Sequence, residues 1–432
     1  MPVNMNIVKN PEENLWKELL QRPSFDTRHL DDQVRKILED VKENGDKAVI
    51  SYTKKYDGVH RDPLQCSAVD IKAAKYEVSD ELKAAIDEAK RNIQKFHTAQ
   101  VTGNVSVETT PGVRCWQKTV PIQRVGLYIP GGTAPLISTA LMLGIPARLA
   151  GCREVVLCTP PKSDGKVHDA ILYIAELIGI DKVFGIGGVQ AIAAMAYGTE
   201  SVPAVNKIFG PGNQYVTAAK QLVSRESVAI DMPAGPSELA IIADDSAHPG
   251  FLASDLLSQA EHGADSQVIL VTDSAGLIDR VRKEVDLQLA KLPRKELAEK
   301  ALNNSKLIQL DGMESIVRMI NAYAPEHLII SCRNQGEVAD QIVNAGSIFL
   351  GRFTPESAGD YASGTNHTLP TNGWAHAYGG LNMDSFVKKI TFQEITRYGL
   401  FNIGDAVMEL AAAEELQAHS NAVRIRLQSE EE

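Results

Sequence analysis

VGLYIPGGTAPLISTALMLGIPARLAGCREVVLCTP, residues 125–160, decides the fold of this chain. The stretch begins with a strand-like apolar run, passes through a turn rich in glycine and proline into an apolar segment of helical length, and ends in a second strand-like run at 154–160. A strand, a crossover helix and a second strand make a βαβ unit, whose two strands run parallel in one sheet. The stretch therefore predicts an α/β fold with a mostly parallel sheet.

The same alternation continues along the chain. After residue 160, strand-like runs follow at 182–187, 205–210 and 228–233, separated by helix-like segments. The pattern starts again after Ser237, with strand-like runs at 239–244, 267–273, 306–310, 328–332 and 346–351. We therefore expect two α/β units in succession.

The flanking segments have a different pattern. Residues 1–25 are expected to form a helical arm, residues 28–56 a helix broken at Gly45, and residues 79–100 a helix capped by Ser79. Two short strands are expected at 105–110 and 113–118. Near the carboxyl terminus we expect helices at 392–399 and 403–423, followed by a strand-like end at 423–428.

The composition excludes several classes of protein. The chain has 432 residues, 44% of them hydrophobic and only 6% aromatic, a balance typical of an α/β core. Its net charge of -11 and the lack of a Lys/Arg-rich run argue against nucleic acid or an anionic membrane as a partner. Five scattered cysteines without a C-x-x-C predict reduced thiols. Neither a signal peptide nor an apolar run of membrane-spanning length is present, so we expect a cytoplasmic protein.

Three glycine-rich turns, at 128–132, 185–190 and 209–213, each follow a strand-like run and precede a helix-like one. At such corners the N–H groups of a helix amino terminus can bind phosphate. The dinucleotide fingerprint is incomplete, because Gln190 stands where a third glycine would follow Gly185 and Gly187. No acidic residue about twenty positions further on is convincingly placed for a ribose. A cofactor site and ordinary tight turns both remain open at this point.

Gln259 and His262 lie three residues apart in SQAEHG (258–263), shortly after the run IDMPAGPSE (230–238). On a helix this spacing puts both side chains on one face, where a carboxamide and an imidazole can bind a divalent metal. Taken by themselves, these residues favour an ordinary helix end, with His262 near the negative end of the helix dipole and Gly263 as cap.

Glu326 and His327 are adjacent at the start of an apolar strand-like run. Histidine is the side chain best suited to proton transfer near neutral pH, so an acid/base pair is predicted slightly ahead of a solvated strand start. Asp360 and His367 lie in a long loop rich in Gly, Ser and Thr, which is typical of functional loops and of surface excursions alike. Glu414 and His419 lie five apart in the helical tail, where a lone histidine is more often structural than a ligand.

Five of these segments together are similar to the L-histidinol dehydrogenase family. They are IDMPAGPSE (230–238), SDLLSQAEHG (254–263), PEHLII (325–330), ESAGDYASGTNHTLPT (356–371) and LAAAEELQAH (410–419). The resemblance extends over essentially the whole chain and shows no departure at the motif positions. It implies an enzyme of the EC 1.1.1.23 class that oxidises L-histidinol through L-histidinaldehyde to L-histidine, in the last steps of histidine biosynthesis.

The resemblance also implies a role for particular residues. One Zn²⁺ per subunit would be bound by Gln259, His262, Asp360 and His419. Glu326 and His327 would be the acid/base residues. The substrate would contact the zinc ligands and His327 together with Ser237 and Glu414. NAD would contact one residue from each glycine-rich corner, namely Tyr128, Gln190 and Asn213.

The family is a homodimer whose site is shared between subunits, so Glu414 and His419 would reach the partner. The implied fold has two incomplete Rossmann-like domains with mostly parallel sheets, an amino-terminal arm (1–25) and a helical carboxyl-terminal tail (382–432). The first domain (26–127 and 239–381) would be split around the second (128–238).

The implied chemistry is two successive oxidations. His327 would take the hydroxyl proton as hydride leaves for NAD, Glu326 would activate the water that hydrates the aldehyde, and His327 would act again in the second oxidation. The zinc ion, without thiolate ligands, would orient the substrate nitrogens. No cysteine lies near the motifs, which argues against a thiohemiacetal route. Two alternatives remain, a zinc hydrolase that uses Glu326 and His327 to activate water and a non-catalytic ligand-binding relative.

Overall fold

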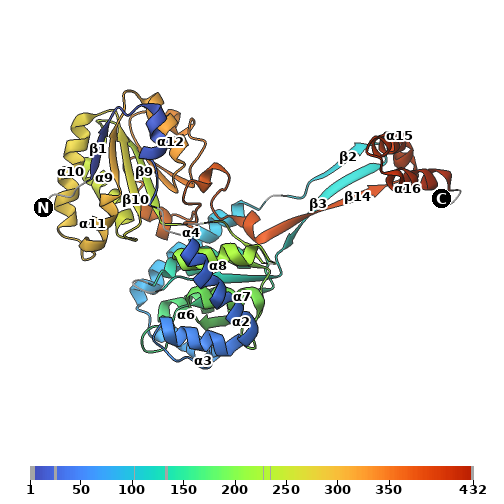
Figure 1. Cartoon of the computed structure of the whole chain (residues 1–432), viewed down its shortest axis with the longest axis horizontal. Helices are drawn as coiled ribbons and strands as arrows, with labels where there is room; N and C mark the ends of the chain where they lie inside the picture. Colours follow the sequence, from blue (N-terminus) through green and yellow to red (C-terminus); the bar gives the residue numbers. More distant parts are fainter. Residues whose placement is uncertain are drawn as a thin grey trace.

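The computed structural model describes residues 5–23, 27–101, 103–131, 135–226, 228–233 and 235–429, with the backbone alone at 27–29. Gly132 of the first glycine-rich corner, Ala234 of the 230–238 run and the chain ends at 1–4 and 430–432 lie outside these residues. Two parallel sheets and one antiparallel sheet organise the described part of the chain (Figure 1).

The six-stranded parallel sheet, called sheet A, has the order β1-β11-β10-β9-β12-β13. Its strands are β1 (Asn6–Lys9), β9 (Glu238–Ala243), β10 (Gln267–Thr272), β11 (Lys306–Gln309), β12 (His327–Ser331) and β13 (Ser347–Leu350). Alternate residues of β9 point to opposite faces, as the strand period requires. Leu239 and Ile241 pack with helices α9 (Pro249–Ala260), α10 (Ala275–Leu289) and α11 (Lys295–Asn303). Ala240 and Ile242 pack with α12 (Met313–Tyr323), so both faces are buried.

The five-stranded parallel sheet, called sheet B, has the order β6-β5-β4-β7-β8. Its strands are β4 (Arg124–Tyr128), β5 (Glu154–Thr159), β6 (Lys182–Gly185), β7 (Lys207–Phe209) and β8 (Ala229–Ile230). One face packs with α3 (Ala68–Ala73), α4 (Asp80–Ala99), α5 (Ile137–Leu149) and α6 (Asp169–Ile178). The other face packs with α2 (Thr27–Tyr56), α7 (Gly188–Tyr197) and α8 (Gln214–Ser224).

Both sheets contain the same five-strand arrangement. In each, the first strand of the unit is central, the second and third lie on one side of it, and the fourth and fifth lie on the other. A complete Rossmann sheet adds a sixth strand beyond the fifth, which the described residues supply in neither sheet, and β1 instead extends sheet A beside β11. The predicted fold class of two incomplete Rossmann-like domains with mostly parallel sheets, an arm and a helical tail is confirmed.

The flanking segments are partly confirmed and partly corrected. Gly45, at φ 54, interrupts α2, and Ser79 caps α4 as predicted. The amino-terminal arm is not purely helical, because β1 pairs with β11 through backbone hydrogen bonds that no local sequence pattern predicts. Residues 392–395 belong to β14 (Val387–Ile395), and 423–428 are helical in α16 (Gln417–Gln428), so both of those predictions were wrong.

The structure shows on which sheet the helices of residues 26–127 pack. Helices α2 and α4 pack on sheet B, although residues 26–127 were expected to belong with 239–381. An amphipathic helix shows that it covers an apolar surface but not which sheet provides that surface. The predicted domain boundaries therefore stay a prediction.

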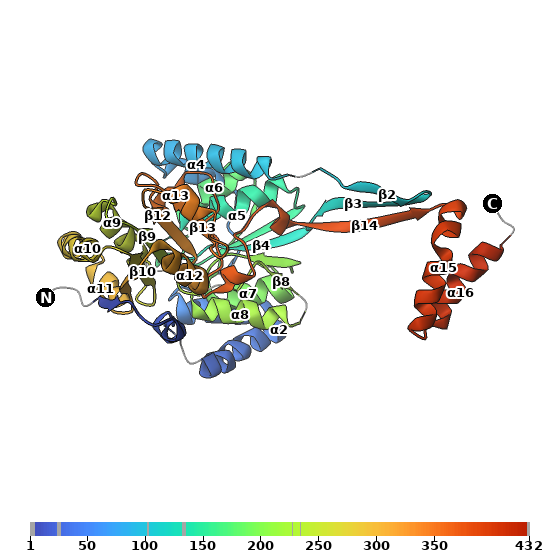
Figure 2. The ribbon, with the colours of Figure 1, turned by 90° about the horizontal axis from the view of Figure 1, so that it is seen from above.

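A second, longer arm, called the carboxyl-terminal arm, extends from the body of the molecule (Figure 2). The antiparallel sheet of β2 (Ser106–Thr110), β3 (Val113–Pro121) and β14 extends outward and carries α15 (Arg397–Ala413) and α16 at its far end. These two helices pack mainly on each other and leave large apolar side chains exposed, with Phe401 73% and Leu410 67% exposed. None of the helices in the described ranges has the length and apolarity of a membrane span.

Candidate active site

A cleft of about 1170 Å³ lies between the two sheets. Sheet A contributes its amino-terminal edge, with Ser237 just before β9 and His262 a few residues before β10. Sheet B contributes its carboxyl-terminal edge, with Pro130 after β4 and Asn213 after β7. Open α/β sheets ordinarily bind ligands at their carboxyl ends, as sheet B is placed to do. Sheet A departs from that rule.

Glu326 and His327 lie at the amino-terminal end of β12, which is flanked by β9 and β13. This central position buries both side chains, and each contacts the backbone of Glu238. The Glu238 N–H donates to Glu326 Oε2 at 2.9 Å. His327 Nδ1 lies 3.1 Å from the Glu238 carbonyl oxygen, and because that oxygen can only accept, Nδ1 carries the proton. Nε2, which has no hydrogen-bond partner among the described residues, is the nitrogen left to accept a proton.

The surroundings of the His327 imidazole are strongly acidic. Nε2 lies 3.8 Å from Glu356 Oε1 and 3.7 Å from Asp360 Oδ1, and Nδ1 lies 3.5 Å from Glu326 Oε2. Burial lowers the pKa of His327, but the nearby carboxylates outweigh burial and raise the pKa to about 10. The structure thus gathers three carboxyl groups around one buried ring, a charge arrangement that attracts a cation.

Three side chains beside this ring form a cluster suited to a metal ion. One ligand atom each from His262, Glu356 and Asp360 lie within 4.8 Å of one another. Gln259, the last but one residue of α9, is buried next to them. Its carboxamide nitrogen, oriented toward Glu356, donates to Oε1 at 2.6 Å. His262 lies beyond the end of α9, so the predicted shared helix face is not what brings Gln259 and His262 together.

Glu356 is a site residue that the sequence interpretation missed. It begins the short helix α14 (Glu356–Tyr361), is 1% exposed, and accepts a hydrogen bond from Ser258 Oγ at 3.2 Å. Burial raises the pKa of this carboxyl to about 8. The signal was present, because Glu356 and Asp360 lie one helical turn apart and so share a face.

Glu414 and His419 do not join this cluster within the chain. Both are exposed, Glu414 at the end of α15 and His419 near the start of α16. Figures 1 and 2 agree in placing these helices at the tip of the extended arm, away from α9 and β12.

The residues predicted for the glycine-rich corners occupy the carboxyl edge of sheet B. The Tyr128 hydroxyl accepts from the Gly188 N–H at 3.1 Å and so connects the first corner to the second. Gln190 is buried, and its Oε1 has no partner among the described residues. Asn213 caps α8 by accepting from the N–H groups of Tyr215 and Val216, and it lines the cleft.

Asp57 supplies the carboxylate that a search along the local sequence did not find. It follows the end of α2, far from the corners in sequence, and its Oδ2 accepts from Gln190 Nε2 at 3.4 Å. Burial raises the pKa of this carboxyl to about 6. Packing of α2 on α7, not sequence proximity, thus brings a carboxylate to this edge of sheet B.

Comparison with known proteins gives a consistent result over almost the whole chain. The family model described as Histidinol dehydrogenase matches residues 20–427. The histidinol dehydrogenase of Bacteroides thetaiotaomicron is 60% identical over 98% of this chain and 99% of its own length. That of Escherichia coli (strain K12) is 53% identical over 95% of this chain and 94% of its own length. The crystal structure of histidinol dehydrogenase from Elizabethkingia anophelis superposes with a TM-score of 0.96 at 53% identity, covering 99% of both chains.

Proposed function

Because the chain belongs to the histidinol dehydrogenase family, an oxidoreductase family of histidine biosynthesis, we propose that it oxidises L-histidinol to L-histidine in two steps with zinc and NAD. The observation that carries the proposal is the position of His327. Its Nε2, without a hydrogen-bond partner among the described residues, lies 3.8 Å from Glu356 Oε1 and 3.7 Å from Asp360 Oδ1. These two side chains cluster with His262, which lines the same cleft as Asn213 of the third glycine-rich corner.

The residues of sheet A fit a divalent metal ion. Imidazole and carboxylate oxygen donors without a thiolate suit zinc and related ions, and they suit a site that leaves positions open for substrate. Gln259, His262 and Asp360 would bind the ion, with His419 from a second subunit. When bound, the ion orients the substrate nitrogens and offsets the carboxylate charge around His327.

The corners of sheet B fit a dinucleotide. The buried Gln190 Oε1 has no hydrogen-bond partner in the described part of the chain. Gly210, at φ +124, brings its backbone so close to Tyr128 that a Cβ would lie 2.1 Å from the carbonyl oxygen. Only glycine fits at this corner, which keeps the turn after β7 close to the turn after β4 at the edge where such sheets bind ligands. Tyr128, Gln190 and Asn213 would contact NAD, which supplies the hydride acceptor for each step.

The chain's own residues account for the proton transfers. In the first oxidation His327 accepts the hydroxyl proton of histidinol at Nε2, while its Nδ1–H stays bonded to the Glu238 carbonyl and fixes the ring. Glu326 then takes a proton from the water molecule that adds to the aldehyde, and His327 returns its proton to the carbonyl oxygen, which completes the hydrate and restores the free Nε2. In the second oxidation His327 accepts a hydroxyl proton of the hydrate. Both side chains are buried, which holds them in fixed positions relative to a bound substrate.

The carboxyl-terminal arm is the segment that would complete the metal and substrate site. In one chain Glu414 and His419 lie at the tip of the arm, and apolar residues of α15 and α16 are exposed there. A homodimer in which each arm reaches the partner would cover this surface and bring His419 to the metal and Glu414 to the substrate. The cytoplasmic location remains a prediction.

The test of the reaction is the stoichiometry of NADH formed on adding L-histidinol to the purified protein with NAD. Two NADH per histidinol are expected, because the alcohol is oxidised to the acid. Chelation should abolish the signal and zinc should restore it. A zinc-loaded dimer that binds NAD and forms no NADH would contradict the proposal and favour the zinc hydrolase, which uses the same Glu326 and His327 without a hydride acceptor.

Asp57→Asn is expected to weaken NAD binding by about tenfold and to reduce the preference for NAD over NADP, because a carboxylate accepts from ribose hydroxyls and repels a 2′-phosphate. The dissociation constants of both nucleotides, measured by calorimetry without substrate, provide the readout. Asp181→Asn, an exposed carboxylate at the opposite edge of sheet B, is the matched control. Equal nucleotide affinities in the two variants would remove Asp57 from the cofactor site.

A further inference from the structure

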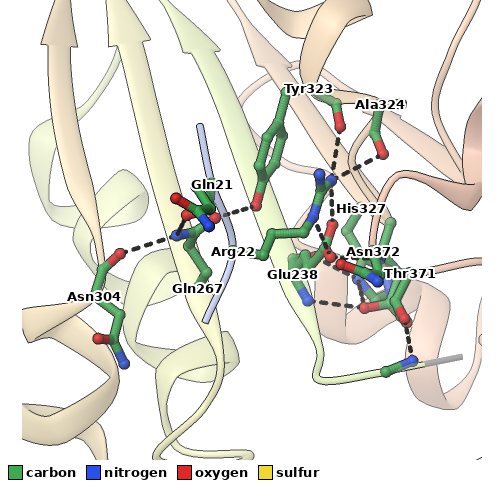
Figure 3. Close-up of polar contacts among 12 residues, drawn as sticks. Gln21, Arg22, Glu238, Gln267, Asn304, Tyr323, Ala324, His327, Thr371 and Asn372 are labelled. Carbon is green, nitrogen blue, oxygen red and sulfur yellow. Dashed lines mark hydrogen bonds and ion pairs between the residues drawn. The ribbon is translucent and has the colours of Figure 1, made fainter. Parts of the chain in front are cut away.

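We propose that Arg22, from the amino-terminal arm, is a positioning residue for the catalytic pair and acts through Glu238. The proposal rests on the proposed roles of Glu326 and His327. Figure 3 shows the guanidinium between the start of β9 and the end of α12. The backbone of Glu238 in β9 contacts the pair, and α12 precedes the pair in the chain.

The first half of the argument is the ion pair between Arg22 and Glu238. Arg22 Nε donates to Oε1 at 2.6 Å and Nη2 donates to Oε2 at 2.8 Å, a two-pronged contact that only arginine can make. The Glu238 side chain is 3% exposed, and its Oε1 also accepts from the Asn372 N–H at 2.5 Å. Such a carboxylate needs its cation, because an unpaired buried charge is strongly unfavourable.

The second half is the backbone that precedes the catalytic pair. Arg22 Nη2 also donates to the carbonyl oxygens of Tyr323 at 2.7 Å and Ala324 at 3.3 Å. Ala324 adopts the left-handed conformation, at φ 49, which is unfavourable for a residue with a side chain. It lies two residues before Glu326, so the contact stabilises a strained turn directly ahead of the catalytic pair.

The two halves converge on Glu326 and His327. The backbone of Glu238 contacts both, through its N–H to Glu326 and its carbonyl oxygen to His327. The Arg22 guanidinium therefore holds both Glu238, which contacts the pair, and the turn at Ala324, which precedes the pair in the chain. These groups belong to sheet A and to the end of α12, except Arg22, which follows α1 (Trp16–Leu19) in the amino-terminal arm. The contact of the amino-terminal arm with sheet A is thus coupled to the geometry of the catalytic pair.

The test compares Arg22→Met with Gln267→Leu. Gln267 also holds the arm, donating from Nε2 to the Gln21 carbonyl oxygen at 3.2 Å, but its side chain hydrogen-bonds Tyr323, Gln21 and Asn304 and not Glu238 (Figure 3). We expect Arg22→Met to lower kcat by about 100-fold, with KM for histidinol and zinc content within about threefold, because misplacing a catalytic group by about 1 Å has an effect of this size. Gln267→Leu should lower kcat by less than about threefold, since loss of arm docking alone leaves the pair in place.

Two further measurements separate positioning from simple stabilisation. Adding Glu238→Gln to Arg22→Met should recover part of the lost kcat, because a neutral carboxamide needs no cation. Hydrogen exchange at the Glu238 amide, which donates to Glu326, should accelerate in Arg22→Met and not in Gln267→Leu. Equal kcat in the two single variants, or a rise in KM at unchanged kcat, would overturn the proposal. If the wild type forms no NADH, the proposed reaction fails. The comparison of exchange rates at the Glu238 amide still tests whether Arg22 positions Glu238.

Discussion

Replacement of His327 by asparagine is expected to lower kcat for histidinol oxidation by about 10³-fold, within the range that a general base contributes. Asparagine is close in size, and its amide N–H can still donate to the Glu238 carbonyl oxygen, as Nδ1 does at 3.1 Å in the histidine. The amide oxygen cannot accept a proton as the imidazole Nε2 can. The fold, zinc content and histidinol affinity should therefore be preserved while both hydride steps slow.

The measurement is the steady-state rate of NADH formation together with zinc content and the dissociation constant of histidinol. His248→Asn, at an exposed histidine before α9, provides the matched control and should keep turnover within about threefold, as expected of a surface substitution. Near-normal turnover in His327→Asn would remove His327 from the mechanism. Loss of zinc or substrate binding at the same time would assign the residue a structural role in the site.

Subunit complementation is the second large effect, and it tests the shared site. His419→Asn and His327→Asn homodimers should each be almost inactive, because one lacks a proposed metal ligand and the other lacks the base. In a heterodimer with arms exchanged, one site carries both defects and the other carries neither. Equal mixing of the two variants under conditions of subunit exchange should restore about a quarter of the wild-type activity.

The outcome depends only on where the tail residue acts. If His419 served its own chain, every site in the mixture would retain one defect, and activity would stay at the level of the separate variants. His376→Asn, an exposed histidine outside the arm, replaces His419→Asn in the control mixture with His327→Asn. That mixture should show only the activity that the His376→Asn subunits contribute on their own. Recovery of activity confined to the His419→Asn mixture would establish that the carboxyl-terminal arm completes the partner's site.

Local sequence was sufficient where the physics is local. The break at Gly45, the cap at Ser79 and the alternation of strands and helices follow from backbone freedom, capping and burial on two faces, and the structure confirms them. It was insufficient in the carboxyl-terminal arm, where Val423 and Leu427 suit a strand by propensity but pack in a helix against Gly404 of α15. Strand propensity depends on neighbours that a single segment cannot supply.

The candidate site divides in the same way. The motifs at 258–263, 325–330 and 356–371 identified the family, and the family is confirmed by relatives over nearly the full length. The sequence by itself therefore determined the α/β fold class, the family and the candidate residues Gln259, His262, Glu326, His327 and Asp360. Their roles and those of the tail residues remain predictions.

Only the tertiary structure decided which distant groups share one environment. It added Glu356 to the cluster around His327, brought Asp57 to the corners of sheet B, and placed Arg22 on Glu238. It also separated Glu414 and His419 from the site within one chain. The physical reason is that helix and strand patterns follow from interactions between residues close in sequence. The electrostatics of a buried site depend instead on side chains that packing brings together from segments hundreds of residues apart.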